Sequence, residues 1–150
     1  MTDAAVAVPL PSRPASDKRE AILAAALRLI ARLGLHAAPM SAVAREAGVA
    51  AGTLYLYFPS KEAMINALYL EVLADRDHSM TEDSGAAKAS GAIGRAGLWA
   101  FWQGLARWHL EHPEASNFLW QCKSSAILTD ETREAERRMN AEGLASFEQA

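Results

Sequence analysis

Few side chains in this sequence are spaced for chemistry at a metal ion or as nucleophiles. His109 and His112 lie three residues apart with Glu111 between them, which suits metal binding from one helix face, but no further ligands stand at metal spacing. Cys122 is the only cysteine, which excludes an internal disulfide and a cysteine-built zinc site, and we expect it to be a small buried apolar residue. The sequence therefore predicts neither a metal site nor a cofactor.

Motifs typical of enzymes are also missing. The sequence has no phosphate-binding glycine loop and no Gly-x-Ser-x-Gly nucleophile motif. An enzyme is the class of protein that these residues favour least.

A second group of side chains offers contacts to phosphate. Thr53, Tyr55 and Tyr57 carry hydroxyl groups, and Lys61 stands at the start of a predicted helix. The helix dipole disfavours a cation at that end, and a phosphate bound there would reverse the sign, because it meets both the ammonium group and free backbone N–H groups. Such phosphate contacts position a protein on nucleic acid without specifying bases.

The elements that position these residues are predicted to be helices throughout. Apolar residues recur at helical spacing, whereas no strand-like alternation and no internal repeat occurs, so the fold class is all-α. Residues 1–16, rich in Ala, Pro and Ser, predict a flexible arm, and the Ser, Gly, Ala and acidic residues of 79–97 predict a loop or a poorly formed helix. The first three predicted helices occupy residues 17–33, 39–47 and 50–58, and Ser60 caps a fourth. A fifth predicted helix begins at Leu98 and ends before His112-Pro113, and a sixth passes through Phe118 to about Leu128. The last predicted helix is capped by Thr129 or Asp130.

Residues 39–58 have the plan of a helix-turn-helix, two short helices joined by a glycine turn. Gly48 can take the positive φ that a tight turn requires, and Ala44 is small where the two helices cross. In this motif the second helix lies in the major groove of DNA. The apolar anchors that hold the pair against the first helix are predicted to be Val43, Ala47, Val49, Leu54 and Tyr57.

The turn and second helix resemble those of the TetR/AcrR family of transcriptional regulators, which read close to G-V-S-x-G-T-L-Y-x-Y-F-x-S-K-E. The run in this chain is Gly48-Val49-Ala50-Ala51-Gly52-Thr53-Leu54-Tyr55-Leu56-Tyr57-Phe58-Pro59-Ser60-Lys61-Glu62. The first predicted helix, with Ala24-Ala25-Ala26-Leu27 and the Gly34 stop, is similar as well, so the resemblance covers residues 17 to about 70.

The resemblance implies a domain organisation and a function. It implies a helix-turn-helix DNA-binding domain over 17–62, with its motif at 39–58, followed by a helical region over 63–150 for effector binding and dimerisation. The implied function is that of a sequence-specific regulator, most often a repressor, which binds a pseudo-palindromic operator as a homodimer and releases it when a ligand moves the fourth helix. The DNA-binding residues that it implies are Ser41, Ala50, Ala51, Gly52, Thr53, Tyr55, Tyr57 and Lys61.

Two positions depart from the family pattern. The usual Ser at the start of the recognition helix is Ala50 here, so we expect that helix to lack a side-chain cap. Ala51 stands where a polar or basic residue often precedes the glycine, so few side chains are expected to read base edges by hydrogen bonds. We expect modest discrimination by direct hydrogen bonding and more from DNA shape.

All four tryptophans lie between residues 99 and 120, together with two phenylalanines. For any one of them a packed core is the simpler interpretation, but the set exceeds what a small helical bundle needs. Because the family places its effector pocket among these middle helices, the resemblance implies an aromatic-lined cavity for a small hydrophobic or aromatic effector. The residues concerned are Trp99, Phe101, Trp102, Trp108, Phe118 and Trp120.

Composition and charge agree with such a protein. Its 51% apolar and 22% charged residues exclude a disordered chain, and the sequence has neither a signal peptide nor an apolar run long enough for a membrane helix, so we expect a cytoplasmic protein that does not enter membranes. The net charge of −3 argues against binding nucleic acid by bulk electrostatics. Residues 1–62, however, hold seven basic against five acidic residues, and the remainder holds eight against thirteen.

Two other functions remain open from the sequence. The helix-turn-helix can serve as a protein-docking module, or the chain can be a small-molecule-binding helical protein without a DNA function. Family members usually end with two further helices that form the four-helix bundle of the dimer, whereas this sequence ends at Gln149-Ala150 inside a predicted helix. The resemblance thus implies either a fragment that lacks the last helices or a dimer formed through another surface.

Overall fold

A computed structural model describes residues 17–89 and 95–148 of the chain. Over these residues the chain is helical with short connections and contains no strand, which confirms the predicted all-α class. The arm predicted for residues 1–16 lies outside the described residues. The helices are α1 (Asp17–Leu33), α2 (Met40–Glu46), α3 (Ala51–Tyr57), α4 (Lys61–Ala89), α5 (Arg95–Glu111), α6 (Pro113–Lys123) and α7 (Asp130–Glu148).

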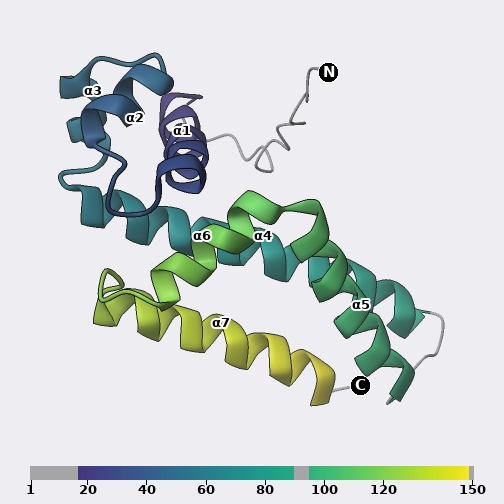
Figure 1. Ribbon diagram of the computed structural model, residues 1–150. Helices are drawn as coiled ribbons and strands as arrows, with labels where there is room; N and C mark the ends of the chain where they lie inside the picture. Colours follow the sequence, from purple (N-terminus) through teal and green to yellow (C-terminus); the bar gives the residue numbers. More distant parts are fainter. Residues whose placement is uncertain (1–16, 90–94, 149–150) are drawn as a thin grey trace, which may run out of the picture.

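Helices α1, α2 and α3 form an N-terminal unit at one end of the molecule (Figure 1). α1 ends as predicted at Gly34, where φ is 90°, a left-handed conformation that favours glycine. α2 packs on α1, and α3 packs on α2. The buried side chains of this unit include Ile22, Leu23, Ala26, Ile30, Val43, Ala44, Leu54 and Phe58.

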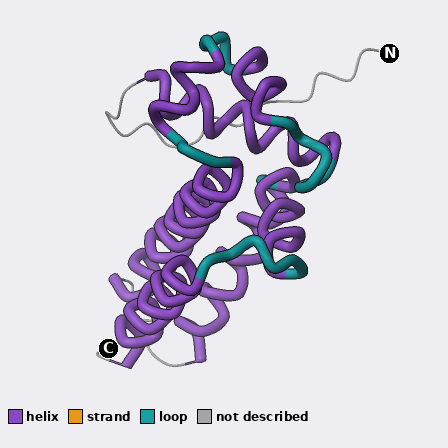
Figure 2. Tube along the Cα trace, turned by 90° about the vertical axis from the view of Figure 1, so that its left-hand side faces the viewer, coloured by secondary structure: helices purple, strands orange, loops and turns teal. Residues whose placement is uncertain are grey.

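Helix α4 joins the N-terminal unit to the rest of the molecule (Figure 2). Ser60 Oγ accepts a hydrogen bond from the backbone N–H of Ala63 at 3.0 Å, which confirms the predicted cap. The helix continues to Ala89, so of the two alternatives predicted for 79–97, a loop or a poorly formed helix, the loop is wrong up to that residue. Residues 90–94 are not described, and helix resumes at Arg95. The physical reason is packing: α4 and α5 lie along each other and bury Met80, which stabilises helix where composition alone does not.

Helices α5, α6 and α7 surround α4 in the second part of the molecule (Figure 1). α5 ends before His112-Pro113 as predicted, and Pro113 begins α6, where its missing N–H breaks no hydrogen bond. α6 ends at Lys123 instead of the predicted Leu128, because the two serines that follow it bond their N–H groups back to the last turn. Thr129 caps α7 by accepting a hydrogen bond from the N–H of Thr132 at 3.2 Å.

One apolar core extends through both parts of the molecule. Side chains of α4 such as Leu68 and Leu73 are fully buried and belong to the same cluster as the core of the N-terminal unit. Trp108 of α5 and Phe118 of α6 close this cluster at the other end. Among the described helices, none is both long enough and apolar enough to cross a membrane.

Candidate nucleic-acid interface

A glycine turn sets the angle between α2 and α3. Gly48 has a φ of 69°, and its N–H donates to the carbonyl of Arg45 at 3.2 Å. The N–H of Val49 donates to the carbonyl of Ala44 at 3.0 Å, and the extended backbone of Ala50 then starts α3. The helix-turn-helix predicted for residues 39–58 is therefore present.

Helix α3 turns one face to the core and the other to solvent. Leu54 is fully buried, and Thr53 and Tyr57 are half-buried beside it. Ala50 provides no side-chain cap, as expected from its residue type. The predicted DNA-binding residues that are exposed are Ser41 on α2 and Ala50, Ala51, Gly52 and Tyr55 around α3.

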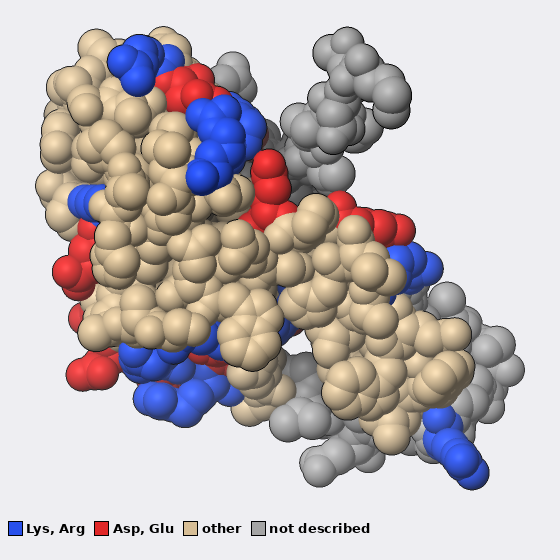
Figure 3. Space-filling model, viewed as in Figure 1, with Lys and Arg blue, Asp and Glu red and all other residues tan. Residues whose placement is uncertain are grey.

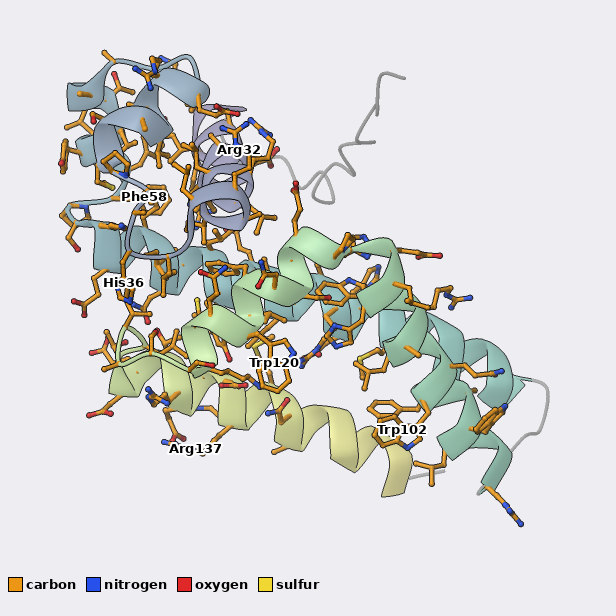
Figure 4. All side chains as sticks on the ribbon, in the orientation of Figure 1. Arg32, His36, Phe58, Trp102, Trp120 and Arg137 are labelled. Carbon is orange, nitrogen blue, oxygen red and sulfur yellow. The ribbon has the colours of Figure 1, made fainter. Side chains whose placement is uncertain are left out.

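Lys61 connects the start of α4 with the loop after α1. Its Nζ donates a hydrogen bond to the backbone carbonyl of His36 at 3.0 Å, and Figure 4 shows His36 beside the first turns of α4. Partial burial lowers the pKa of the Lys61 ammonium group. An ammonium group has three donors, so this bond leaves two for a phosphate oxygen.

Acidic side chains neutralise most arginines of the N-terminal unit. Glu46 at the end of α2 pairs with Arg28 and Arg32 of α1, each at 3.3 Å, and the hydrogen bond from Arg28 is the main reason that the pKa of Glu46 is lowered. Arg19 pairs with Glu71 of α4. In Figure 3, basic and acidic groups lie side by side on this part of the molecule, and much of the remaining visible face is uncharged.

One exposed cation of this surface, Arg45, is not among the DNA-binding residues predicted from the sequence. Arg45 lies one helical turn after Ser41 on α2 and has no ion-pair or hydrogen-bond partner among the residues that the structure describes. The spacing of four residues was the available signal, because it places both side chains on one helix face. Arg45 thus joins Ser41 as a candidate for phosphate contact.

Two polar side chains that the sequence analysis did not single out connect segments that are remote in the sequence. Gln121 of α6 accepts a hydrogen bond from the backbone N–H of Leu35 at 2.8 Å. Asn66 of α4 is buried, donates to the carbonyl of Ile127 at 2.9 Å and accepts from the N–H of Thr129 at 3.0 Å. No local pattern marks such residues, because their partners are remote in the sequence.

The aromatic residues predicted to line an effector cavity divide between core and surface. Trp108 and Phe118 are buried in the core, where Trp108 Nε1 donates to Asp75 Oδ2 at 3.0 Å. The Trp108 ring also stacks on the His112 ring, with centroids 5.0 Å apart. These two aromatic residues therefore hold α4, α5 and α6 together.

The other four aromatic residues lie nearer the surface. Phe101 is half-buried and meets Trp102 edge-on, with ring centroids 6.2 Å apart, and Trp120 is exposed on α6. In Figure 4, Trp102 and Trp120 project toward the side of the molecule occupied by α7. An open hollow of about 560 Å³ is lined by Arg95, Leu98, Trp99 and Trp102.

The two histidines considered as metal ligands have partners within the protein. His109 Nδ1 shares a hydrogen bond with the Ser116 hydroxyl at 2.7 Å, and His112 Nδ1 donates to the carbonyl of Trp108 at 3.0 Å. In the part of the chain that the structure describes, no group of three or more His, Cys, Asp or Glu side chains is placed to hold a metal ion. Cys122 is fully buried, as predicted, and burial raises the pKa of its thiol to about 12.

Comparison with known proteins bears on the segment that contains this interface. Residues 22–68 match the family model described as bacterial regulatory proteins, tetR family. The match begins in α1, includes α2, the glycine turn and α3, and ends within α4. The helix-turn-helix segment of this chain is therefore similar to that of the tetR family of bacterial regulatory proteins.

Curated regulators match a stretch of the chain that is somewhat longer than this segment. The chain is 42% identical over 62 residues to the fatty acid metabolism regulator protein of Bacillus subtilis (strain 168), which covers 41% of this chain and 32% of that protein. It is 46% identical over 63 residues to the HTH-type transcriptional repressor KstR of Rhodococcus jostii (strain RHA1), which covers 41% of this chain and 30% of that protein. The aligned part thus spans about a third of the length of these relatives.

The likeness to solved TetR-family structures extends further along the chain. A TetR family transcription regulator from Marinobacter aquaeolei VT8 superimposes with a TM-score of 0.76 and 28% sequence identity, over 89% of this chain and 68% of that one. The arrangement of the later helices therefore also follows a TetR-family fold.

Proposed function

We propose that this chain is a sequence-specific DNA-binding transcriptional regulator that represses its target until a ligand binds. The observation that carries the proposal is the exposed face of α3 on a helix-turn-helix whose surrounding segment, 22–68, matches the TetR family. The name of the Rhodococcus jostii relative, a transcriptional repressor, supports the sign of the regulation. A regulator of a bacterial chromosome acts in the cytoplasm.

The proposed contacts are of two kinds: contacts to phosphates that position the protein on DNA, and contacts to bases that recognise the sequence. Lys61, Arg45 and the hydroxyl groups of α2 and α3 meet phosphates and fix the register of the protein on the duplex. The exposed face of α3 enters the major groove. The residues proposed for this interface are Ser41, Arg45, Ala50, Ala51, Gly52, Thr53, Tyr55, Tyr57 and Lys61.

The proposed DNA-bound form is a homodimer. Two helix-turn-helix units about 34 to 36 Å apart meet successive major grooves on one side of the duplex. A twofold axis between them requires a pseudo-palindromic operator, so the symmetry of the operator reports the symmetry of the protein.

The proposed effector is a small hydrophobic or aromatic molecule that binds against the second part of the chain. The exposed rings of Trp99, Trp102 and Trp120 offer apolar contact area, whereas Trp108 and Phe118 support these helices from the core. Effector binding releases DNA only if the effector prefers a conformation in which the two recognition helices are out of register.

Helix α4 is the proposed connection between effector and DNA. Met64, Leu68 and Val72 are buried on it and belong to the core shared with the N-terminal unit. A shift of α4 therefore displaces α3, because the packed core transmits the movement.

In-vitro selection from random duplexes tests the DNA-binding function. We expect recovery of a pseudo-palindromic site. Lys61→Ala should weaken binding to all sequences alike and reduce the salt slope by about one unit per subunit. Lys123→Ala is the matched control, since Lys123 lies on α6 and pairs with Glu136 at 3.0 Å. Failure to enrich any duplex, or Lys61→Ala binding as tightly as wild type, contradicts the proposal.

Tryptophan fluorescence tests the effector part of the proposal. Titration with a panel of hydrophobic and aromatic compounds should change the emission of the exposed tryptophans, and Trp120→Phe should reduce that change. A panel without any spectral response contradicts an effector at these rings and leaves the DNA-binding function standing.

A further inference from the structure

Leu56 is an unusually exposed apolar residue on the helix proposed to read DNA. Its side chain is 86% exposed, while Leu54, two residues earlier on the same helix, is fully buried. A single exposed leucine is common on protein surfaces and needs no explanation by itself. The residues around Leu56 on α3, however, indicate a functional role for it.

Gly52 lies one helical turn before Leu56 on the same face of α3. Glycine weakens a helix relative to alanine, and here φ is not positive and a Cβ would meet no atom within 4 Å. Nothing in the fold of the described residues therefore requires glycine at this position. Glycine at this position lets a surface from outside the chain come closer to the helix than any side chain would allow.

The outer face of α3 also lacks charge. The helix reads Ala-Gly-Thr-Leu-Tyr-Leu-Tyr and contains no basic or acidic residue, so neither Arg nor Lys is available on it for guanine. Among groups on base edges in the major groove, the thymine methyl is the one that an aliphatic side chain contacts favourably. An exposed leucine beside an open glycine matches that group in chemistry and in reach.

We propose that Leu56 is a specificity-determining residue that contacts the 5-methyl group of a thymine in each half of the operator. Gly52 allows α3 to lie close enough for this contact. The inference rests on the proposed DNA-binding function and adds to it the chemical group that is read.

The test removes only the methyl group. In the operator recovered by selection, each thymine is replaced in turn by deoxyuridine, and binding is measured for wild type and Leu56→Ala. At one thymine position in each half-site, we expect replacement in a single half-site to weaken binding of the wild type roughly four-fold, the equivalent of one buried methyl group. Replacement in both half-sites should weaken it roughly sixteen-fold. Leu56→Ala should bind the thymine and deoxyuridine operators alike at that position.

Two further variants separate this contact from general effects. Leu110→Ala removes another leucine of similar exposure, 82%, on α5, and should keep the sensitivity to deoxyuridine. Gly52→Ala should fold normally, as urea denaturation can verify, yet bind more weakly and lose the methyl discrimination.

The possible outcomes separate the Leu56–thymine contact from the proposed DNA-binding function. A wild-type protein that binds the operator equally well whichever thymine is replaced overturns the inference and leaves the DNA-binding function intact. Leu56→Ala with the deoxyuridine sensitivity of wild type also overturns it. A wild-type protein that binds no duplex overturns the proposed function and this inference together.

Discussion

Gln121 Oε1 accepts a hydrogen bond from the backbone N–H of Leu35 at 2.8 Å and so joins α6 to the loop between α1 and α2. Leu35 is 3% exposed, so water does not readily replace this acceptor if it is removed. The bond connects the N-terminal unit with the helices proposed to sense the effector.

Loss of this bond should lower stability. Gln121→Leu leaves the N–H of Leu35 without an acceptor and should reduce the free energy of unfolding by about 1 to 3 kcal/mol, measured by urea denaturation. Gln121→Glu retains an acceptor oxygen and should lose less. Gln103→Leu, at an exposed position of α5, is the control and should change stability by less than about 0.5 kcal/mol. Equal losses for the two Gln121 variants would count against the bond.

Asn66 is expected to hold the loop before α7. Its amide donates to the carbonyls of Glu62 and Ile127 and accepts from the N–H of Thr129. Asn66→Leu leaves the Ile127 carbonyl and the Thr129 N–H without these partners and should cost about 1 to 3 kcal/mol of unfolding free energy. Hydrogen exchange of the Thr129 amide should accelerate, while the exposed Asn140→Leu control leaves it unchanged. Unaltered exchange at Thr129 in the Asn66 variant would show that the hydrogen bonds of Asn66 do not hold this loop.

The pH dependence of stability should include a contribution from Glu46. Arg28 lowers the pKa of Glu46 below 4.5 in the folded protein, so the pair stabilises the fold above that value and this stabilisation is lost as pH falls through the folded pKa. Glu46→Gln should therefore lower stability at neutral pH and have progressively less effect as the pH falls through the folded pKa. Salt should reduce the difference, because the pair is at the surface. Glu131→Gln is the control, and the same pH profile in both variants would contradict the assignment.

The Cys122 thiol should react slowly in the folded protein. Burial raises its pKa to about 12, so at pH 8 the reactive thiolate is about a thousand-fold scarcer than in an unfolded chain. Reaction with a chromogenic disulfide should be slow in native buffer and fast in concentrated urea. Equal rates in the two conditions would show that the thiol is accessible.

Local signals in the sequence predicted the ends of most helices. Gly34 and Gly48 both adopt positive φ, and Ser60 and Thr129 both provide helix caps. Each of these features depends on a few neighbouring residues, which is why a sequence pattern of the same length is sufficient. The contact of α3 with DNA stays a prediction that rests on the family resemblance and on the exposure of residues such as Gly52.

Features that depend on packing between remote segments were not predictable. The helical state of residues 79–89 follows from packing against α5, and the hydrogen bond of Gln121 spans 86 positions. The tryptophans have the same residue type and similar sequence context, yet Trp108 is buried and Trp120 is 70% exposed. Burial of one aromatic ring is set by which neighbours the fold brings to it, and no pattern along a single helix carries that information.

The ion pairs of Glu46 have a consequence for counterion release. Because Arg28 and Arg32 are held by an acid, the cations up to the first turn of α4 without an acidic partner among the described residues are Lys18, Arg45 and Lys61. Each phosphate neutralised contributes about −0.9 to the slope of log K against log salt, so Arg45 and Lys61, the two that belong to the proposed interface, give a slope of about −2 for one subunit. With so few unpaired cations among the described residues of the proposed interface, DNA binding would displace few ions, and the affinity for an operator would vary comparatively little with ionic strength.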